Sequence, residues 1–237
     1  MVIWPFPILN GRTVKNGVRW SKLLKHMTIL LGVKWEVRNG EMLAKDRGAV
    51  IVANHQSTLD IVGMLQIWET AEKLTVISKK ALLYAGPAGV ISYFGGIIFI
   101  DRRNPKNAYK QLEEAAKVVN EKVKIWFFPE GTRNFDYTKM LPFKKGAFTL
   151  AVAAQVPIIP VVFSPYYFID RKNYILNKGH AIIRCLDEVP TTGLTMDDVP
   201  ELIERVRNTM LAAYRELTDE VRPTTPNSGS KDKHDEI

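Results

Sequence analysis

A histidine and an aspartate suited to joint acid–base chemistry lie five positions apart in the first quarter of the chain. They are His55 and Asp60, in the stretch Asn54-His-Gln-Ser-Thr-Leu-Asp60. Five residues on a continuous helix span roughly 140° around the axis, so the two side chains can pair only if the backbone turns between them. A carboxylate beside an imidazole fixes its tautomer and stabilises its protonated form. The pattern predicts a general base, and a hydrogen-bonded structural histidine is the alternative.

The residues around this pair predict that it lies at the edge of a sheet. The run Ala49-Val-Ile-Val-Ala is short, apolar and rich in β-branched residues, which is typical of a buried parallel strand. Asn54 and His55 then follow its carboxyl end, where open α/β sheets carry their chemistry. Ser57 or Thr58 is suited to cap a helix that begins at this turn.

Three later stretches also combine an apolar, strand-like run with residues at its end. They are Gly96–Arg102, Phe128–Asn134 and Val156–Val162. In the first, the guanidinium of Arg102 is a planar fork that matches phosphate oxygens, and an ion pair with Asp101 is the alternative. The first stretch therefore predicts a phosphate contact.

The polar turn Glu130-Gly-Thr-Arg in the second stretch combines a carboxylate with groups that bind anions. Gly131 can expose backbone N–H groups, and Arg133 adds positive charge. Glu130 is suited to hold a substrate hydroxyl or an arginine, and a structural ion pair with Arg133 is the alternative. Lys144, near the start of the next predicted helix, is a further candidate for a phosphate of the substrate or of coenzyme A.

Taken in order, the four stretches resemble the four motifs of the glycerolipid acyltransferases, and most closely those of the animal 1-acylglycerol-3-phosphate (lysophosphatidate) acyltransferases. The resemblance extends over residues 36–222. An H-x4-D pair alone is a weak signal, whereas four motifs in the same order are a specific one.

The resemblance implies transfer of an acyl group from acyl-coenzyme A to the sn-2 hydroxyl of 1-acyl-glycerol-3-phosphate, which gives phosphatidate. Acyl-coenzyme A is then a co-substrate, and no cofactor or metal is implied. The implied location is the endoplasmic reticulum membrane, with the active site facing the cytosol. The implied catalytic residues are His55 and Asp60, and the implied substrate-binding residues are Asn54, Arg102, Glu130, Gly131, Thr132, Arg133 and Lys144.

Composition is compatible with this function without selecting it. The 237 residues are 46% apolar and 24% charged, as in ordinary globular proteins, and are expected to form one large domain. A net charge of +8 indicates an anionic partner: nucleic acid, an anionic membrane surface or a phosphorylated substrate. The single cysteine, Cys185, can form no internal disulfide, which points to a reducing compartment, and it is expected to be a small buried hydrophobe.

The N-terminal part of the chain predicts contact with a membrane surface. Residues 14–31 place apolar side chains at helical spacing with lysines and arginines between them, which is typical of a basic amphipathic helix. A surface helix packed on the core is the alternative. No run approaches the ~18 apolar residues of a spanning helix. We divide the chain into a membrane-associated segment at 1–40, an acyltransferase domain at 41–222 and a disordered tail at 223–237.

A second stretch, late in the chain, also favours lipid. Aromatic and basic residues alternate loosely there, a pattern that suits stacking on bases or insertion at a lipid interface. Nothing else in the sequence resembles a nucleic-acid module, so we predict a lipid surface and no nucleic acid. The residues are Tyr166, Tyr167, Phe168, Arg171, Lys172, Tyr174 and Lys178.

The alternation of strands and helices predicts an α/β fold with a largely parallel central sheet flanked by helices. Alternative functions remain open at this point. The acceptor could be another lysophospholipid or glycerol-3-phosphate. A thioesterase with Ser57 as nucleophile is less compatible, because no G-x-S-x-G elbow is present. A non-enzymatic binder of anionic lipid would need only the basic residues.

Overall fold

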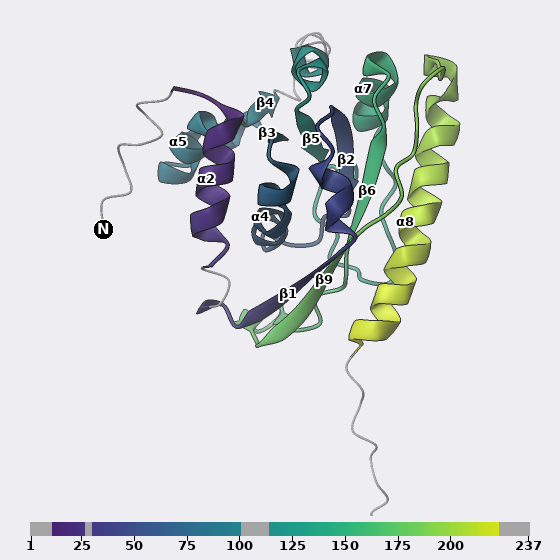
Figure 1. Cartoon of the computed structure of the whole chain (residues 1–237). Helices are drawn as coiled ribbons and strands as arrows, with labels where there is room; N and C mark the ends of the chain where they lie inside the picture. The colour runs from purple at the N-terminus through teal and green to yellow at the C-terminus, as the bar shows by residue number, and fades with distance from the viewer. Residues whose placement is uncertain (1–10, 27–29, 101–113, 223–237) are drawn as a thin grey trace, which may run out of the picture.

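A seven-stranded sheet forms the centre of the molecule (Figure 1). The computed structural model describes residues 11–26, 30–100 and 114–222. The predicted phosphate ligand Arg102 and the predicted tail at 223–237 lie outside the described residues. The strands, in their order across the sheet, are β1 (Val33–Arg38), β9 (Gly179–Cys185), β6 (Ile158–Phe163), β2 (Ala49–Ala53), β5 (Lys124–Phe127), β3 (Leu74–Lys79) and β4 (Ile98–Ile100).

Neighbouring strands of this sheet are parallel except at one place. β6 and β9 are antiparallel, and β1 is parallel to β9, so β1 and β9 run against the other five strands. The start of β9 therefore lies at the same edge of the sheet as the carboxyl ends of β2, β5 and β6. The predicted α/β fold with a largely parallel sheet is confirmed.

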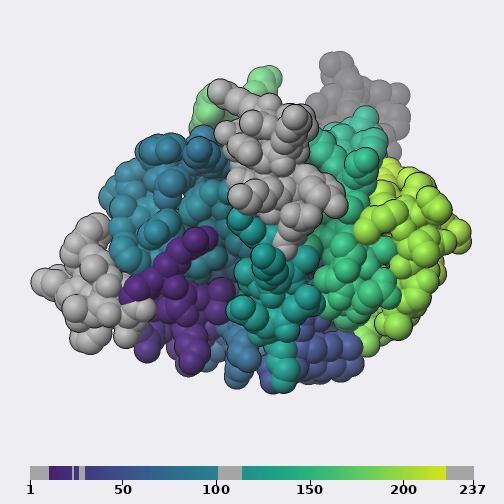
Figure 2. All heavy atoms as spheres, turned by 90° about the horizontal axis from the view of Figure 1, so that it is seen from above, coloured from purple at the N-terminus to yellow at the C-terminus, as the bar shows by residue number. Residues whose placement is uncertain are grey.

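Helices cover both faces of the sheet (Figure 1). One face carries α4 (Asp60–Ala71), on which α2 (Val14–Leu24) packs, with α5 (Pro87–Phe94) beside α2. The other face carries α7 (Gly146–Ala154) and α8 (Val199–Val221). Seen from above, the purple α2 and the yellow α8 lie at opposite sides of the molecule (Figure 2). Shorter elements among the described residues include η1 (Gly40–Ala44), η2 (Lys80–Tyr84), η3 (Met196–Asp198), β7 (Ile169–Asp170) and β8 (Ile175–Leu176).

The central strand β2 supplies side chains to both cores. Val50 and Val52 belong to the cluster beneath α7 and α8, and Ile51 belongs to the cluster beneath α4. All five β2 residues are fully buried, which explains why the strand reads as a continuous apolar run instead of an alternating one. This burial fixes the position at which the chain leaves the sheet and enters the His55 turn.

The predicted amphipathic helix at 14–31 is described as α2, which ends at Leu24, and residues 27–29 lie outside the described part. Its buried face packs on α4, with Gly17 against the ring of Trp68. Lys22 and Lys25 form ion pairs with Glu69 of α4. These contacts fit the packed-helix alternative. None of the described helices is both long enough and apolar enough to cross a bilayer.

β1 is an element that the sequence reasoning missed. It falls inside the segment assigned to 1–40, yet it pairs with β9 from Val33 to Arg38. Residues 33–38 therefore belong to the same sheet as the strands of the predicted acyltransferase domain.

Candidate active site

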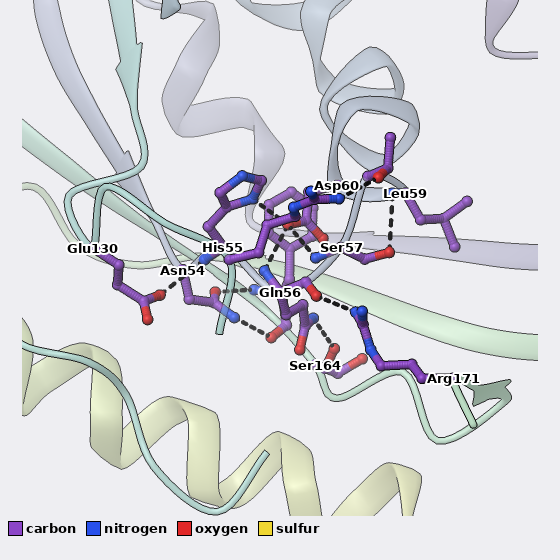
Figure 3. A network of polar contacts seen from close by, with 12 residues as sticks. Asn54, His55, Gln56, Ser57, Leu59, Asp60, Glu130, Ser164 and Arg171 are labelled. Atoms are coloured by element: carbon purple, nitrogen blue, oxygen red, sulfur yellow. Dashed lines mark hydrogen bonds and ion pairs between the residues drawn. The ribbon is translucent and has the colours of Figure 1, made fainter. Parts of the chain in front are cut away.

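The His55 turn brings an imidazole and a carboxylate together at the carboxyl end of β2 (Figure 3). His55 Nδ1 lies 2.7 Å from Asp60 Oδ2. The His55 ring stacks on Phe128, with ring centroids 4.1 Å apart. Its side chain keeps 21% exposure, whereas Asp60 is fully buried. The predicted turn between the two residues is present, and Nδ1 faces the carboxylate.

Asp60 also shapes the turn itself. Its Oδ2 accepts the backbone N–H groups of Gln56 and Ser57 at 2.7 and 2.9 Å, in addition to the His55 contact. Asp60 is the first residue of α4, where the helix dipole favours negative charge. These donors stabilise the charged carboxylate, and the charged carboxylate fixes Nδ1–H as donor. The other ring nitrogen, Nε2, is then free to accept a proton.

The helix cap differs from the predicted one. Neither Ser57 nor Thr58 is the N-cap of α4; that position is Leu59, without a side-chain cap bond. Ser57 Oγ accepts the N–H of Leu59 instead, and Thr58 accepts a hydrogen bond from Arg133. The first N–H groups of α4 are satisfied by backbone carbonyls instead, because Asp60, Ile61 and Val62 donate to the carbonyls of Ser57, Thr58 and Leu59.

Two buried amides hold the turn to the end of β6 (Figure 3). Asn54 Nδ2 donates to the carbonyl of Phe163, and Asn54 Oδ1 accepts the N–H of the same residue. Gln56 Nε2 donates to the carbonyl of Ser164. This geometry gives Asn54 a structural role in positioning His55, and its predicted contact with substrate stays a prediction.

Glu130 lies beneath the turn and is almost fully buried. Its Oε1 accepts the N–H of His55 at 2.9 Å, and its Oε2 accepts the N–H of Leu141 at 3.1 Å. Burial raises the pKa of this carboxyl, and the two N–H donors oppose the shift. The alternative role, an ion pair with Arg133, is not found, because Arg133 donates to Thr58 and the Glu130 oxygens accept backbone N–H groups. Its contact with a substrate hydroxyl stays a prediction.

Two guanidinium groups border the His55 turn. Arg133 donates to Thr58 Oγ1 at 2.8 Å, and Arg171 donates to the carbonyl of Gln56. Both lie over the exposed ring of Phe135. The distance from Cζ to the ring centroid is 5.9 Å for Arg133 and 3.8 Å for Arg171. A cation over an aromatic face is held in place while its remaining N–H groups stay available. The arginines thus provide a cationic surface beside the imidazole.

Lys144 extends the cationic surface over the Glu130-Gly-Thr-Arg turn. Gly131 has a φ of +71°, and a Cβ there would lie 2.8 Å from Lys144 Nζ. The positive φ favours glycine at this position, and the absent side chain leaves room for Lys144. Thr132 is exposed on the same turn. The structure thus brings together Gly131, Thr132, Arg133 and Lys144, whose contacts with substrate stay predictions. The N–H of Gly131, which was predicted to face an anion, donates to the carbonyl of Phe128 instead.

Arg171, Phe135 and Tyr166 belong to the site but were not among the predicted site residues. Tyr166 is fully buried, and burial raises its pKa well above the usual value, with a further contribution from the nearby charge of Asp60. The basic and aromatic composition of residues 166–178 was a usable signal for Tyr166 and Arg171. That composition could not show that the chain folds back and brings Arg171 to Gln56.

Two further predictions concern reactive groups. Burial raises the pKa of the Cys185 thiol to about 12, so Cys185 behaves as the buried hydrophobe that was expected. Among the described residues, no group of three His, Cys, Asp or Glu side chains could hold a metal ion.

A small pocket adjoins the imidazole and is lined by Asn54, His55, Gln56, Glu130, Asn134, Lys139, Met140 and Tyr214.

Together these groups are equipped to deprotonate a hydroxyl and to bind an anionic group near it. His55 is a base with one nitrogen fixed by Asp60, and Arg133 and Arg171 border the same turn. An alcohol is a poor nucleophile until a base removes its proton. The geometry therefore supports attack by the hydroxyl of a negatively charged substrate.

Comparisons with known proteins agree with this chemistry. A family model described as acyltransferase matches residues 34–164. The human 1-acyl-sn-glycerol-3-phosphate acyltransferase alpha is 42% identical over 92% of this chain and 77% of its own length. The human beta protein is 38% identical over 93% of this chain and 79% of its own length.

A solved structure has the same fold. The 1-acyl-sn-glycerophosphate (LPA) acyltransferase PlsC of Thermotoga maritima superposes with a TM-score of 0.69 at 25% identity, covering 86% of this chain and 80% of the other. The matched family model spans the Asn54–Asp60 turn and the Glu130–Arg133 turn. With the motifs, the sheet and the site in agreement, the chain belongs to the acyltransferase family.

Proposed function

We propose that this acyltransferase transfers an acyl group from acyl-coenzyme A to the sn-2 hydroxyl of 1-acyl-glycerol-3-phosphate, giving phosphatidate. The observation that carries the proposal is the 2.7 Å contact between His55 Nδ1 and Asp60 Oδ2, at a turn bordered by Arg133 and Arg171. The relatives named for this activity support the choice of substrate.

The reaction requires one base and no covalent intermediate. His55 Nε2 takes the proton of the sn-2 hydroxyl as its oxygen attacks the thioester carbonyl carbon. The new C–O bond forms, the C–S bond breaks, and the coenzyme A thiolate leaves and is protonated. Asp60 stabilises the imidazolium that forms, and its buried position makes that interaction stronger than it would be in water.

The acceptor's phosphate binds the guanidinium groups beside the turn. Arg133 is exposed and uses one N–H on Thr58, which leaves further N–H groups for a phosphate. Arg171, whose guanidinium also lies over the Phe135 ring, adds a second positive charge. Lys144, over Gly131, is suited to a phosphate of acyl-coenzyme A. Acyl-coenzyme A is the co-substrate in this scheme, with no cofactor.

A lipid surface is the proposed place of the reaction. Both the acceptor and the product carry long acyl chains, and apolar side chains are exposed on the described surface, including Leu30 and Tyr174. The net charge of +8 suits an anionic membrane surface. The free, buried Cys185 suits a reducing compartment. We therefore propose the endoplasmic reticulum membrane, with the site facing the cytosol.

A thioesterase with Ser57 as nucleophile has less support. Ser57 is buried, and its Oγ accepts the N–H of Leu59. Asp60 Oδ2 also accepts the Ser57 N–H, so the residue is part of the turn. This contact set suits a structural serine.

Product analysis tests the proposed reaction. Purified protein receives acyl-coenzyme A together with lysophosphatidate, lysophosphatidylcholine, lysophosphatidylethanolamine or glycerol-3-phosphate, and the products are identified by mass. We expect phosphatidate from lysophosphatidate and slower turnover with the other acceptors. Faster transfer to another acceptor would replace the proposed substrate, and acyl-coenzyme A hydrolysis without transfer would support a thioesterase.

Replacing Arg133 by alanine is expected to weaken use of lysophosphatidate and to spare acyl-coenzyme A. Loss of one charge-assisted contact costs about 1.5–3 kcal/mol, or roughly a 10- to 150-fold fall in kcat/KM for the acceptor. Arg133→Lys should recover only part, because a point charge replaces a fork. Separate KM measurements for the two substrates give the answer.

Arg12→Ala is the matched control for this variant. Arg12 also donates one hydrogen bond, to the carbonyl of Ile97, and also lies over an aromatic ring, that of Tyr93. It lies two residues before α2, away from the His55 turn, so its replacement should leave both KM values unchanged. A rise in KM confined to acyl-coenzyme A in Arg133→Ala would instead place Arg133 at the donor.

A further inference from the structure

A short hairpin leaves the sheet between β6 and β9 and presents apolar side chains to solvent. It is formed by β7 and β8, and Tyr174 at its turn is 97% exposed with a φ of +55°. Asp170 closes the turn, because its carboxylate accepts the backbone N–H and the side-chain amide of Asn173. Ile175 and Leu176 follow with 48% and 41% exposure. The hairpin therefore displays a ring and two aliphatic side chains on a closed turn.

Two more exposed leucines come just before Gly32, which contacts the end of the hairpin segment. Leu30 is 84% exposed and Leu31 39%, and both precede β1. The next residue, Gly32, accepts the N–H of Gly179, and a Cβ at Gly32 would lie 3.0 Å from Lys178. We name the apolar set Leu30, Leu31, Tyr174, Ile175 and Leu176 the hairpin rim.

The surroundings of the rim are basic. Lys172 and Lys178 are exposed on the hairpin segment. Asp170 is the acidic residue of the same segment, and its carboxylate is engaged in the turn. Apolar side chains flanked by lysines match a surface that is apolar inside and anionic outside.

The hairpin that carries part of the rim also contacts the active-site turn. Arg171, one residue after the end of β7, donates to the carbonyl of Gln56 in the His55 turn. The start of β9 also lies at the sheet edge where β2 and β6 end. In Figure 1, β1 and β9 begin at the lower end of the molecule, toward which α2 also runs. The rim and His55 are thus at one end of the protein.

We propose that the hairpin rim docks the enzyme on an anionic lipid bilayer, so that the acceptor's hydroxyl reaches His55 while its acyl chain stays among the lipids. The inference rests on the proposed function, since it takes the acceptor to be a lysophospholipid. Each methylene withdrawn from the bilayer lowers the equilibrium constant about fourfold, so an enzyme in solution would extract a long-chain acceptor at a prohibitive cost. A bilayer is the partner that matches both the rim and this substrate.

The test measures binding and activity on the full chain separately. Flotation with phosphatidylcholine vesicles, with and without phosphatidylserine, gives partition coefficients for the wild type and for a Tyr174→Glu, Ile175→Glu double variant. We expect partition at least about tenfold weaker in the double variant. Its KM for long-chain lysophosphatidate in vesicles should rise, whereas kcat/KM for a dispersed short-chain lysophosphatidate should stay within about twofold. Lys172→Glu with Lys178→Glu should reduce the preference for phosphatidylserine.

Met196→Glu is the matched control. Met196 is 50% exposed, similar to the 48% of Ile175. It lies in η3 before α8, outside the rim. Its replacement should leave partition unchanged. Equal partition of the double variant and the wild type, or equal loss in Met196→Glu, would overturn the proposal. So would an equal loss of activity on the dispersed acceptor, which would assign the hairpin to catalysis. A wild type that binds vesicles but acylates neither acceptor would refute the proposed function alone.

Discussion

His55→Ala is expected to lower kcat/KM by about 10²–10⁴-fold, the usual contribution of a general base. The base is lost, and the sn-2 hydroxyl then has to attack the thioester while still protonated. Turnover is measured with saturating acyl-coenzyme A, and binding of lysophosphatidate should change little, because the arginines are untouched. Near-normal turnover in this variant would end the mechanism proposed above.

The fold should survive this replacement. His55 keeps 21% exposure, and its main packing contact is the stack on Phe128. The backbone N–H that donates to Glu130 is present in alanine as well. His180→Ala is the matched control, since His180 is also a partly exposed histidine beside an acid, Glu36. Its activity should equal that of the wild type, and both variants should unfold close to the wild-type temperature.

Asp60→Asn is expected to cost on the order of 10³–10⁴-fold in kcat, although it changes one atom. With the amide oxygen toward the turn, the three donors keep their acceptor but the imidazolium loses its counter-charge. If the amide nitrogen points toward the turn instead, its N–H groups face the other N–H donors. The His55 proton then moves to Nε2, and Nε2 can no longer act as the base. Steady-state kinetics with both substrates would give the loss.

The pH profile separates this explanation from a general loss of structure. Removing the negative charge beside the base should change the shape of the pH profile of kcat/KM, whereas a loss of folded protein lowers the rate by the same factor at every pH. Asp46→Asn removes a carboxylate from the exposed pairs with Lys73 and Lys122 and should leave the profile unchanged. The double variant His55→Ala, Asp60→Asn should be scarcely slower than His55→Ala alone. Multiplied losses would show that the two residues act independently.

Local patterns were sufficient for the centre of the fold. The buried run of β2 and the glycine and proline signals that bound the other strands predict a parallel sheet with chemistry at its carboxyl edge, as the structure has it. β1 was missed although its apolar residues, Val33, Trp35 and Val37, alternate with charged ones, which is the local pattern of a half-buried strand. What this pattern could not give is the partner strand, β9. Strand pairing over such a separation leaves no mark in a local window.

In the site, the spacing of His55 and Asp60 was informative because both lie in one turn. The roles of Glu130 and Arg171 depend on neighbours far along the chain, His55 and Gln56, and could not be read from spacing. Glu130 illustrates the difference: a glutamate before a glycine and an arginine suggests surface charge pairing, whereas burial beneath the turn makes it an acceptor for backbone amides.

The pairing of β1 with β9 also bears on how the protein is made. Val33 is synthesised early, but its partner Gly179 leaves the ribosome only after the strands that form the middle of the sheet. During translation, β1 and the two leucines before it must therefore wait without their partner strand while β2, β3 and β5 assemble. Late closure of a long-range pair is slow and leaves an apolar edge open to wrong contacts. A nascent chain of this enzyme is thus expected to need protection of its N-terminal end until β9 has been added.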